Sequence, residues 1–146
     1  MIIRRAERGD LDAIVGFYRA DPVHHEPAEG DWASAFEAIA ADPREMLVVA
    51  EEKNRVIGTL QITWLRYLTY GGAHVALVEA VQVAASERNR GVGAALMRFA
   101  IDEARRRGCH RMQLTSNKAR KDAHRFYERL GFTASHEGFK LFLEAP

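Results

Sequence analysis

The sequence predicts a mixed α/β domain, and three observations carry this prediction. Apolar and β-branched residues fill three successive stretches between Met46 and Ala84, as strands do. Apolar residues recur at helical spacing in Leu11–Tyr18 and again in Val92–Phe99. Three strands in a row favour antiparallel pairing, whereas the strand, helix and strand that follow favour one parallel pair.

Composition limits the class of protein. A chain of 146 residues suits one domain, 1–146, and 47% hydrophobic residues are enough for a sizeable core. A formal net charge of +1 gives no reason to expect a nucleic-acid partner. The single cysteine excludes an intrachain disulfide and favours a cytoplasmic location. No apolar run approaches the roughly 20 residues that cross a membrane, and the N-terminus lacks the apolar core of a signal peptide.

The first 45 residues predict a short strand and two helices. Ile2–Ala6 is the strand, and Asp10 is the expected cap of a helix with apolar residues at i, i+3, i+4 and i+7. The two prolines and the glycine of Arg19–Asp31 predict a loop. Asp31 is expected to cap the second helix, which ends at Asp42-Pro43.

The remainder predicts five or six further strands and two helices. Met46–Glu52 and Val56–Leu65 form a hairpin about a Lys53-Asn54 turn. The other expected elements are the strand His74–Ala84, a helix to about Arg107 stopped by Gly108, the strand His110–Ser116, the helix Asp122–Leu130, and one or two strands in Phe132–Glu144. The sum is a twisted, largely antiparallel sheet of six to seven strands with helices on both faces.

A glycine-rich turn, "RNRGVG" (Arg88–Gly93), stands where the long helix must begin. Glycine in a helix costs about 1 kcal/mol relative to alanine, so its presence needs a reason. The N–H groups of a first helical turn lack intrahelical partners and attract anions. Gly91 and Gly93 let the backbone approach phosphate oxygens, and Arg88 and Arg90 add positive charge. The alternative is an ordinary strand-to-helix turn, because the motif is neither a dinucleotide-binding nor a Walker A pattern.

Two motifs together resemble the GNAT superfamily of acyl-CoA-dependent N-acetyltransferases. "RNRGVG" fits its Arg/Gln-x-x-Gly-x-Gly/Ala signature. "AHRFYERLGF" (Ala123–Phe132) is similar to its second signature, Ala-x-x-Phe-Tyr-x-x-x-Gly-Phe. The motifs fall in the usual order and at the usual separation, and the order of elements resembles the GNAT fold from end to end.

The resemblance implies a site for acetyl-CoA, the co-substrate of these enzymes. It implies that the strand His74–Ala84 splays from His110–Ser116 and binds the pantetheine arm through main-chain groups of Val81 and Val83. A main-chain N–H near Val83 is expected to polarise the thioester, and Asn117 to contact the cofactor. Many GNAT proteins dimerise, which predicts a homodimer. The residues expected to bind the pyrophosphate are Arg88, Asn89, Arg90, Gly91, Val92, Gly93 and Ala94.

The resemblance also assigns the proton-transfer residues. Tyr127 matches the frequent general acid of the family, although its spacing also fits an apolar helix face. Glu79 is the candidate base, acting on the amine through water. Strict alternation places Glu79 on one strand face with Val75, Leu77, Val81 and Val83, where a carboxylate needs explaining. A β-bulge would turn Glu79 elsewhere, and an ion-paired residue at the sheet margin is the alternative.

Other chemically active residues carry competing interpretations. Cys109 and His110 suggest an acyl-enzyme pair, but adjacent strand residues face opposite ways, so Cys109 is interpreted as a core residue. His24, His25 and Glu26 lack the spacing of metal ligands, and no metal site is predicted. Lys118, Arg120 and Lys121 form a solvated face or contact the cofactor's 3′-phosphate or an acidic acceptor. Trp64, Tyr67, Tyr70 and His74 suit an acceptor pocket, the core or a subunit interface.

The sequence thus favours an acetyl-CoA-dependent N-acetyltransferase whose acceptor is a primary amine of a small molecule. The amine attacks directly in a ternary complex. The C-terminal third, Thr115–Leu141, is similar to aminoalkylphosphonate N-acetyltransferases, which acetylate small amines bearing an anionic group. One alternative keeps the chemistry and makes the acceptor a protein N-terminus or lysine. Another is a non-catalytic acyl-CoA-binding sensor.

Overall fold

The chain divides into two compact units in a computed structural model that describes residues 1–23, 26–27 and 29–144. The first unit is Met1–Leu114 and the second is Thr115–Pro146. The first holds the sheet and most of the helices, and the second holds one helix and the C-terminal segment. The expectation of a single domain over 1–146 stays a prediction.

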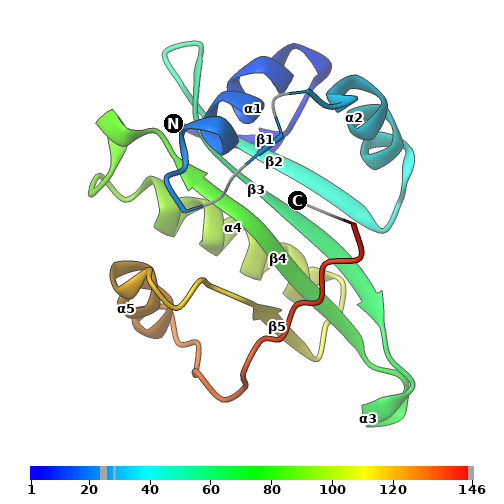
Figure 1. The fold of residues 1–146 in the computed structure, drawn as a ribbon. Helices are drawn as coiled ribbons and strands as arrows, with labels where there is room; N and C mark the ends of the chain where they lie inside the picture. Colours follow the sequence, from blue (N-terminus) through cyan, green and yellow to red (C-terminus); the bar gives the residue numbers. More distant parts are fainter. Residues whose placement is uncertain (24–25, 28, 145–146) are drawn as a thin grey trace. The chain divides into compact units, whose positions relative to one another are not determined.

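A five-stranded sheet forms the centre of the first unit, with its strands in chain order (Figure 1). Each neighbouring pair is antiparallel except β4 and β5, which are parallel. The mixed α/β class and the largely antiparallel sheet are therefore confirmed. The strands are β1 (Ile2–Arg5), β2 (Glu45–Glu52), β3 (Arg55–Arg66), β4 (His74–Val83) and β5 (Arg111–Leu114).

The expected six to seven strands are wrong, because the described part of Phe132–Glu144 contains no strand. The expected strand His110–Ser116 is also shorter and ends at Leu114. An alternating sequence shows that one face of a segment is apolar, but a strand exists only where a neighbouring backbone accepts its hydrogen bonds. The sequence pattern contains no information about that neighbour.

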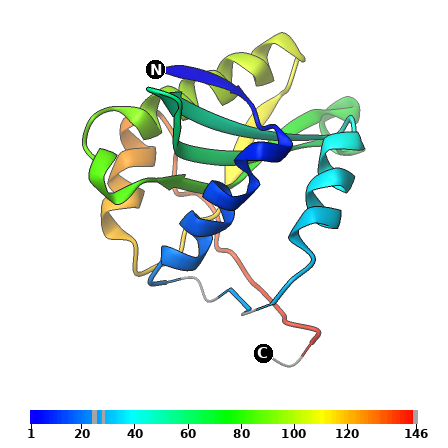
Figure 2. The ribbon, with the colours of Figure 1, turned by 90° about the horizontal axis from the view of Figure 1, so that it is seen from above.

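Helices cover both faces of the sheet, as predicted. Figure 2 shows α1 (Leu11–Ala20) and α2 (Trp32–Ala41) on one face and α4 (Val92–Arg106) on the other. The short helical turns are η1 (Arg8–Asp10), α3 (Thr69–Gly72) and η2 (Ala85–Glu87). The core lies between these layers, and its largest fully buried aliphatic side chains include Val48, Leu60, Ile62, Val75, Val78 and Leu96.

The two predicted helix caps behave differently. Asp31 accepts a hydrogen bond from the Ser34 N–H at 3.0 Å, as an N-cap residue does. Asp10 precedes α1 as expected, but its carboxylate accepts from the Glu7 N–H and from Arg4, both at 2.7 Å. The bond from Arg4 holds the pKa of Asp10 below its ordinary value. Arg4 also pairs with Glu51 at 2.7 Å, so this network ties β1 and β2 to the start of α1.

Gly58 on β3 lets α4 approach the sheet closely. A Cβ at this position would lie 3.0 Å from both the carbonyl oxygen of Gln82 and Cδ1 of Leu96. It would also lie 3.2 Å from Cγ1 of Val92, the first residue of α4. The missing side chain therefore sets how near the beginning of α4 lies to β3 and β4.

The second unit is built around α5 (Lys121–Arg129). Gly131 follows it with φ of 102°, a left-handed conformation that suits glycine after a helix. The Tyr127 ring makes edge contacts with Phe126 at 5.1 Å and Phe132 at 5.9 Å between ring centroids. These aromatic contacts join α5 to the chain beyond it.

Gly58→Ala is expected to destabilise the protein by about 1–3 kcal/mol, because the new methyl group meets backbone that cannot move away. The melting temperature should fall by roughly 3–10 °C in differential scanning calorimetry. Gly16→Ala on α1 is the control, since nothing lies within 4 Å of its Cβ position. That variant should gain about 0.5–1 kcal/mol. Equal melting temperatures for the two variants would contradict the close approach at Gly58.

Candidate functional site

The glycine-rich turn has the backbone that an anion site needs. Gly91 is the N-cap of α4 and has φ of 82°, and Asn89 also lies in the left-handed region at 63°. Nothing lies within 4 Å of the Cβ position of Gly91, so this side of the turn is open. The N–H groups of Val92, Gly93 and Ala94 open the helix and have no intrahelical acceptors. The helix dipole adds positive potential at the same place.

The two arginines of the turn differ in role. Arg90 pairs with Glu87, and with Glu52 at 3.3 Å, so its charge is largely neutralised. Glu87 is only 7% exposed and also binds Arg55 at 3.1 Å. These ion pairs fix the turn between β4 and α4. Arg88 is exposed and forms no ion pair within the residues that the structure describes.

The pairing of the parallel strands β4 and β5 ends before β4 reaches this turn. Their pairing ends at Val78 and Leu114, whereas β4 continues to Val83. The Ala84 N–H donates to the Ile57 carbonyl at 2.8 Å, so Ala84 directs its N–H toward β3. Backbone groups of successive strand residues point in alternate directions, so those of Val81 and Val83 point away from β3. Beyond Val78, this side of β4 has no paired strand among the described residues of the first unit. We call it the open edge, and it carries the main-chain groups of Val81 and Val83 that were predicted from the sequence.

A β-bulge at Ala80 changes the face of the sheet on which the later side chains of β4 lie. Glu79 pairs with Gln61 and Gln82 pairs with Thr59, so β4 has one extra residue at this point. Ala80 adopts φ of 54°, the left-handed conformation that such a bulge requires. Glu79 and Gln82 consequently share the α1 face. Val83 pairs with Gly58 on the α4 face, so the expectation that Val81 and Val83 share the face of Glu79 is wrong.

Polar residues gather on the α1 face of the sheet, around the exposed side chain of Glu79. Asp21, which is 7% exposed, accepts from Nε2 of Gln82 at 2.7 Å and from the Val23 N–H at 3.0 Å. On β2, Glu45 accepts from Gln61 at 2.9 Å. We call the carboxylates of Asp21, Glu45 and Glu79 the acidic strip. Each of these three carboxylates lies on the α1 face of the sheet or at its border.

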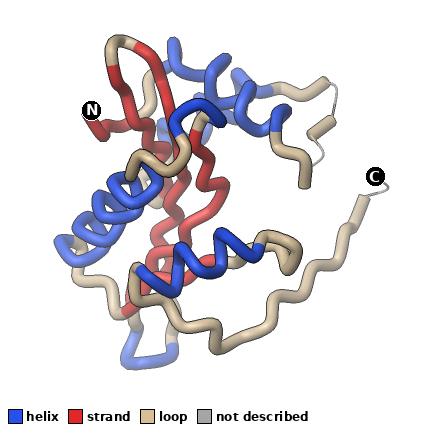
Figure 3. Tube along the Cα trace, turned by 90° about the vertical axis from the view of Figure 1, so that its left-hand side faces the viewer, coloured by secondary structure: helices blue, strands red, loops and turns tan. Residues whose placement is uncertain are grey.

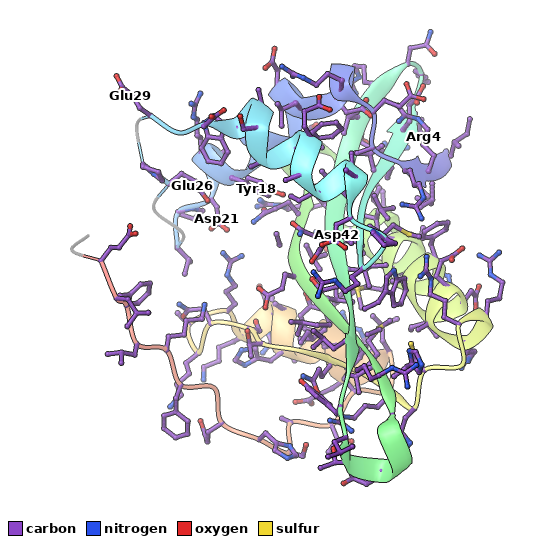
Figure 4. The ribbon with its side chains drawn as sticks, turned by 90° about the vertical axis from the view of Figure 1, so that its right-hand side faces the viewer. Arg4, Tyr18, Asp21, Glu26, Glu29 and Asp42 are labelled. Atoms are coloured by element: carbon purple, nitrogen blue, oxygen red, sulfur yellow. The ribbon has the colours of Figure 1, made fainter. Side chains whose placement is uncertain are left out.

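Tyr18 and Glu26 extend this face at the end of α1. Figure 4 shows them beside Asp21. Burial, reinforced by the charge of Glu26, raises the pKa of Tyr18 to about 12. Tyr18 therefore stays a neutral hydrogen-bond donor at physiological pH.

Tyr127 lies in the second unit and is partly buried. Burial raises the pKa of its hydroxyl, and the charge of Arg120 opposes the increase. The raised pKa keeps the phenol protonated at neutral pH, which is the state that a general acid needs.

Asn117 and its neighbours form the turn that precedes α5. Oδ1 of Asn117 accepts from the Ala119 N–H at 2.9 Å, and its main-chain oxygen accepts from the Arg120 N–H at 3.0 Å. The Asn117 side chain therefore has a structural task besides its predicted contact with a cofactor. In the predicted basic cluster, Lys118 pairs with Glu137 at 3.5 Å in an exposed ion pair.

The aromatic candidates lie at the other end of β4. Trp64 is buried, with the Arg107 guanidinium 4.2 Å from its ring centroid, and so belongs to the core. Tyr70 stacks on His110 at 4.7 Å, and the Tyr67 hydroxyl accepts from Gln113 at 3.3 Å. His74 is the first residue of β4, whereas the glycine-rich turn follows its last. The structure does not bring these residues to the open edge.

The remaining candidates are Cys109 and the loop residues His24, His25 and Glu26. Burial raises the pKa of the Cys109 thiol, which disfavours the thiolate that an acyl-enzyme would require. His24 and His25 lie outside the described residues. Among the residues that the structure describes, no three His, Cys, Asp or Glu side chains gather as metal ligands do. No helix in the described part of the chain is long and apolar enough to span a membrane.

Asp21, Gln82 and Tyr18 are not among the site residues predicted from the sequence. The spacing of Tyr18 predicts a place on an apolar helix face, and its hydroxyl adds no further signal. Gln82 reaches Asp21 only because the bulge at Ala80 turns it to the α1 face. No periodicity in the sequence shows a bulge in advance, so this link needed the structure.

Comparison with known proteins identifies the family of the chain. The model of the Acetyltransferase (GNAT) family matches residues 11–132. An aminoalkylphosphonate N-acetyltransferase of Salmonella typhimurium is 26% identical over 137 residues, which cover 94% of this chain and 88% of that protein. The similarity noted for the C-terminal third thus extends over most of the chain.

Two further proteins are similar. A glucosamine 6-phosphate N-acetyltransferase of Trypanosoma brucei brucei is 33% identical over 89 residues, covering 61% of this chain and 58% of that protein. A crystal structure of a transcriptional regulator from Bacillus halodurans C-125 is 40% identical with a TM-score of 0.92, covering 97% of this chain and 99% of that one. From the family match over most of its length, the chain belongs to the GNAT acetyltransferase family and is an acetyltransferase.

Proposed function

We propose that this enzyme transfers the acetyl group of acetyl-CoA to a primary amine of a small molecule, by direct attack in a ternary complex. The observation that carries the proposal is the open edge of β4 beside the open turn at Gly91. The edge of β4 offers main-chain groups for strand-like hydrogen bonds, and the turn at Gly91 offers an anion site. Acetyl-CoA needs both, because it joins an amide-containing pantetheine arm to a pyrophosphate.

The cofactor's parts match separate groups of the chain. The pyrophosphate is bound by the N–H groups of the turn Arg88–Ala94, with Arg88 as the available cation. The pantetheine amides bind the main chain of Val81 and Val83 as an added strand. A main-chain N–H near Val83 then stabilises the oxyanion that develops on the thioester carbonyl. Asn117 is proposed as a further contact with the cofactor.

Proton transfer is assigned to two side chains. Glu79, exposed on the α1 face, accepts a proton from the substrate ammonium through water, so that the neutral amine attacks the carbonyl carbon. The C–N bond forms, the C–S bond breaks, and the nitrogen loses its second proton to solvent as it becomes an amide. Tyr127 donates its proton to the departing thiolate and regains one from solvent. Its raised pKa supports this role, because the phenol is protonated when the thiolate leaves.

The acceptor is a small primary amine. The acidic strip supports an ammonium substrate, because its carboxylates attract the charged amine before Glu79 deprotonates it. Two of the relatives named above are an aminoalkylphosphonate N-acetyltransferase and a glucosamine 6-phosphate N-acetyltransferase, and each of these names combines an amine with a phosphonate or a phosphate. An amine bearing such an anion is therefore the first class to test. A cytoplasmic location and a homodimer stay predictions from the sequence.

A thiol-release assay with acetyl-CoA tests the function directly. The acceptors should include aminoalkylphosphonates, amino-sugar phosphates, polyamines, amino acids, aminoglycosides and short peptides, each with and without a divalent metal. We expect turnover with a small amine and none without an acceptor. Acetylation of peptides alone would make the enzyme a protein acetyltransferase. Acetyl-CoA binding with no turnover on any acceptor would indicate a sensor.

Gly91→Ala should raise KM for acetyl-CoA about tenfold or more while leaving the fold intact. Gly108→Ala is the matched control, because both glycines have positive φ, of 82° and 71°, and open space at the Cβ position. Both variants should lose about 1 kcal/mol of stability from the left-handed backbone. Steady-state kinetics and thermal denaturation distinguish the effects. An equal change in KM for the two variants would argue against a pyrophosphate site at the turn.

Glu79→Gln should lower kcat/KM for the amine by about 100- to 10,000-fold at neutral pH, because the amide accepts no proton. The loss should shrink as pH rises, since the amine then deprotonates in solution. Glu37→Gln, at an exposed residue of α2, is the control and should leave the rate unchanged. A loss of kcat/KM that stays the same at every pH would contradict the assignment of Glu79 as the base.

Tyr127→Phe should lower kcat with little change in acetyl-CoA affinity, because the ring contacts remain and only the proton donor is lost. The wild-type rate should fall at alkaline pH above the ordinary tyrosine value of about 10, where the raised pKa is passed. The variant should lack that decline. Tyr67→Phe removes a hydroxyl outside the proposed site and serves as the control. Unchanged turnover in the Tyr127 variant would show that another group protonates the thiolate.

A further inference from the structure

Three arginines lie at the end of the sheet where β4 and β5 begin. Arg66 is the last residue of β3, Arg107 follows α4, and Arg111 is the first residue of β5. Arg66 and Arg107 are exposed, and Arg111 is half-buried. None of the three forms an ion pair within the residues that the structure describes. A guanidinium without a carboxylate partner is free to bind an anionic ligand.

Aromatic rings lie among these arginines. The Arg111 guanidinium lies 5.3 Å from the ring centroid of Tyr67 and 5.4 Å from that of Tyr70. The Tyr70 ring stacks on the His110 ring, with 4.7 Å between centroids and 24° between planes. Tyr70 is nevertheless 73% exposed, so most of its surface is open to a ligand.

The loop that carries Tyr70 has an unusual backbone. Tyr70, Gly71 and Gly72 adopt φ of 53°, 71° and 83°, so three successive residues are left-handed. The Tyr67 N–H donates to the Ala73 carbonyl at 2.9 Å and closes the loop. Figure 3 shows this helical turn, α3, beyond the ends of the strands that it connects. The left-handed conformation is unfavourable for tyrosine, and such strain is most often retained at functional sites.

Carboxylates do not neutralise this end of the sheet. On α4, Asp102 pairs with Arg105 at 3.6 Å, and Glu103 pairs with Arg106. The three arginines at the end of the sheet therefore keep their positive charge. The sequence analysis expected no nucleic-acid partner because the formal net charge is +1, but that value averages over the whole chain. A local surface can be basic in a protein that is nearly neutral.

We propose that this end of the sheet binds single-stranded nucleic acid, with a base stacked on Tyr70 and phosphates on the arginines. Proteins that bind single strands combine cations along the phosphates with aromatic rings on which bases stack. The proposal goes beyond the acetyltransferase activity and does not depend on it. We call these residues the arginine-tyrosine surface, and its members are Arg66, Tyr67, Tyr70, Arg107, His110 and Arg111.

The rings favour a single strand over other anionic partners. An acidic peptide would neutralise the arginines, but only a base offers a flat π face to Tyr70. A duplex keeps its bases stacked inside and has no free base for the ring. The requirement for both phosphates and exposed bases therefore points to a single strand.

The width of the surface suits a short stretch of such a strand. Arg66 pairs with His74 on β4, and the next residue, Val75, pairs with Arg111 on β5. Arg66 and Arg111 are therefore two strand spacings apart, roughly 10 Å. That distance accommodates about three nucleotides at a rise of 3.4 Å each.

Fluorescence anisotropy with a labelled uridine strand of about eight nucleotides tests the proposal on the full chain. Saturating CoA is present throughout, so that the strand is kept out of the proposed cofactor site. The dissociation constant should be roughly 1–100 μM at physiological salt. It should rise about 20-fold between about 50 and 200 mM salt if three phosphates are neutralised.

Ring variants test the stacking contact. Tyr70→Ala should raise the dissociation constant for the strand about fivefold or more, because the base loses its platform. Tyr70→Phe retains the ring and should bind as the wild type does. Melting temperature and amine turnover should stay at wild-type values in both, since the side chain is exposed and lies outside the proposed catalytic site.

Charge variants test the phosphate contacts. Arg66→Gln and Arg111→Gln should each weaken binding and reduce the slope of log affinity against log salt by about 0.7. Arg98→Gln is the matched control, because Arg98 is exposed on α4 and has no ion pair in the described part of the chain. This control removes the same charge elsewhere in the first unit and should leave the slope unchanged.

Four results would overturn the proposal. The first is no binding of the uridine strand at about 500 μM protein. The second is binding that occurs only without CoA, which would place the strand in the cofactor site. The third is equal affinity for a duplex or for an oligoglutamate of the same charge. The fourth is equal effects of the Arg98 and Arg111 variants. None of these results bears on amine turnover, so the proposed function is tested separately.

Discussion

One extra residue in β4 determines what each side of that strand presents. The bulge at Ala80 leaves Glu79 on the α1 face and brings Gln82 to the same face, where it binds Asp21. A non-glycine residue at a φ of 54° costs on the order of 1 kcal/mol, so the surrounding pairing must hold it there. Glu79 lies just before the bulge with an exposed side chain, and β4 continues beyond the bulge to Val83.

Ion pairs hold the turn that follows β4 in place, and a glycine leaves one side of this turn free of side chains. Glu87 binds Arg55 and Arg90, so the backbone is fixed before any ligand arrives. Gly91 leaves the approach to the first N–H groups of α4 free of side chains. Gly58 lets α4 lie close to β3 and β4. Preorganisation of this kind lowers the entropy lost when a ligand binds.

The resemblance seen in two short motifs predicted the family, the turn and the long helix correctly, because these depend on local sequence. "RNRGVG" lies where the structure starts α4, and Gly108 follows its end in the left-handed conformation. The hairpin about Lys53 and Asn54 is also found, with both residues at positive φ as a tight turn requires. The roles of Glu79 and Tyr127 stay predictions.

The sequence by itself determined the helices, the first four strands and the open turn, because periodicity, caps and glycines act over a few residues. Only the tertiary structure decided how many strands the sheet has, since Phe132–Glu144 has the pattern of a strand and lacks a partner. It also decided which residues share a face with Glu79. A bulge shifts every later side chain by one position, and it arises from pairing with a distant strand rather than from local preference.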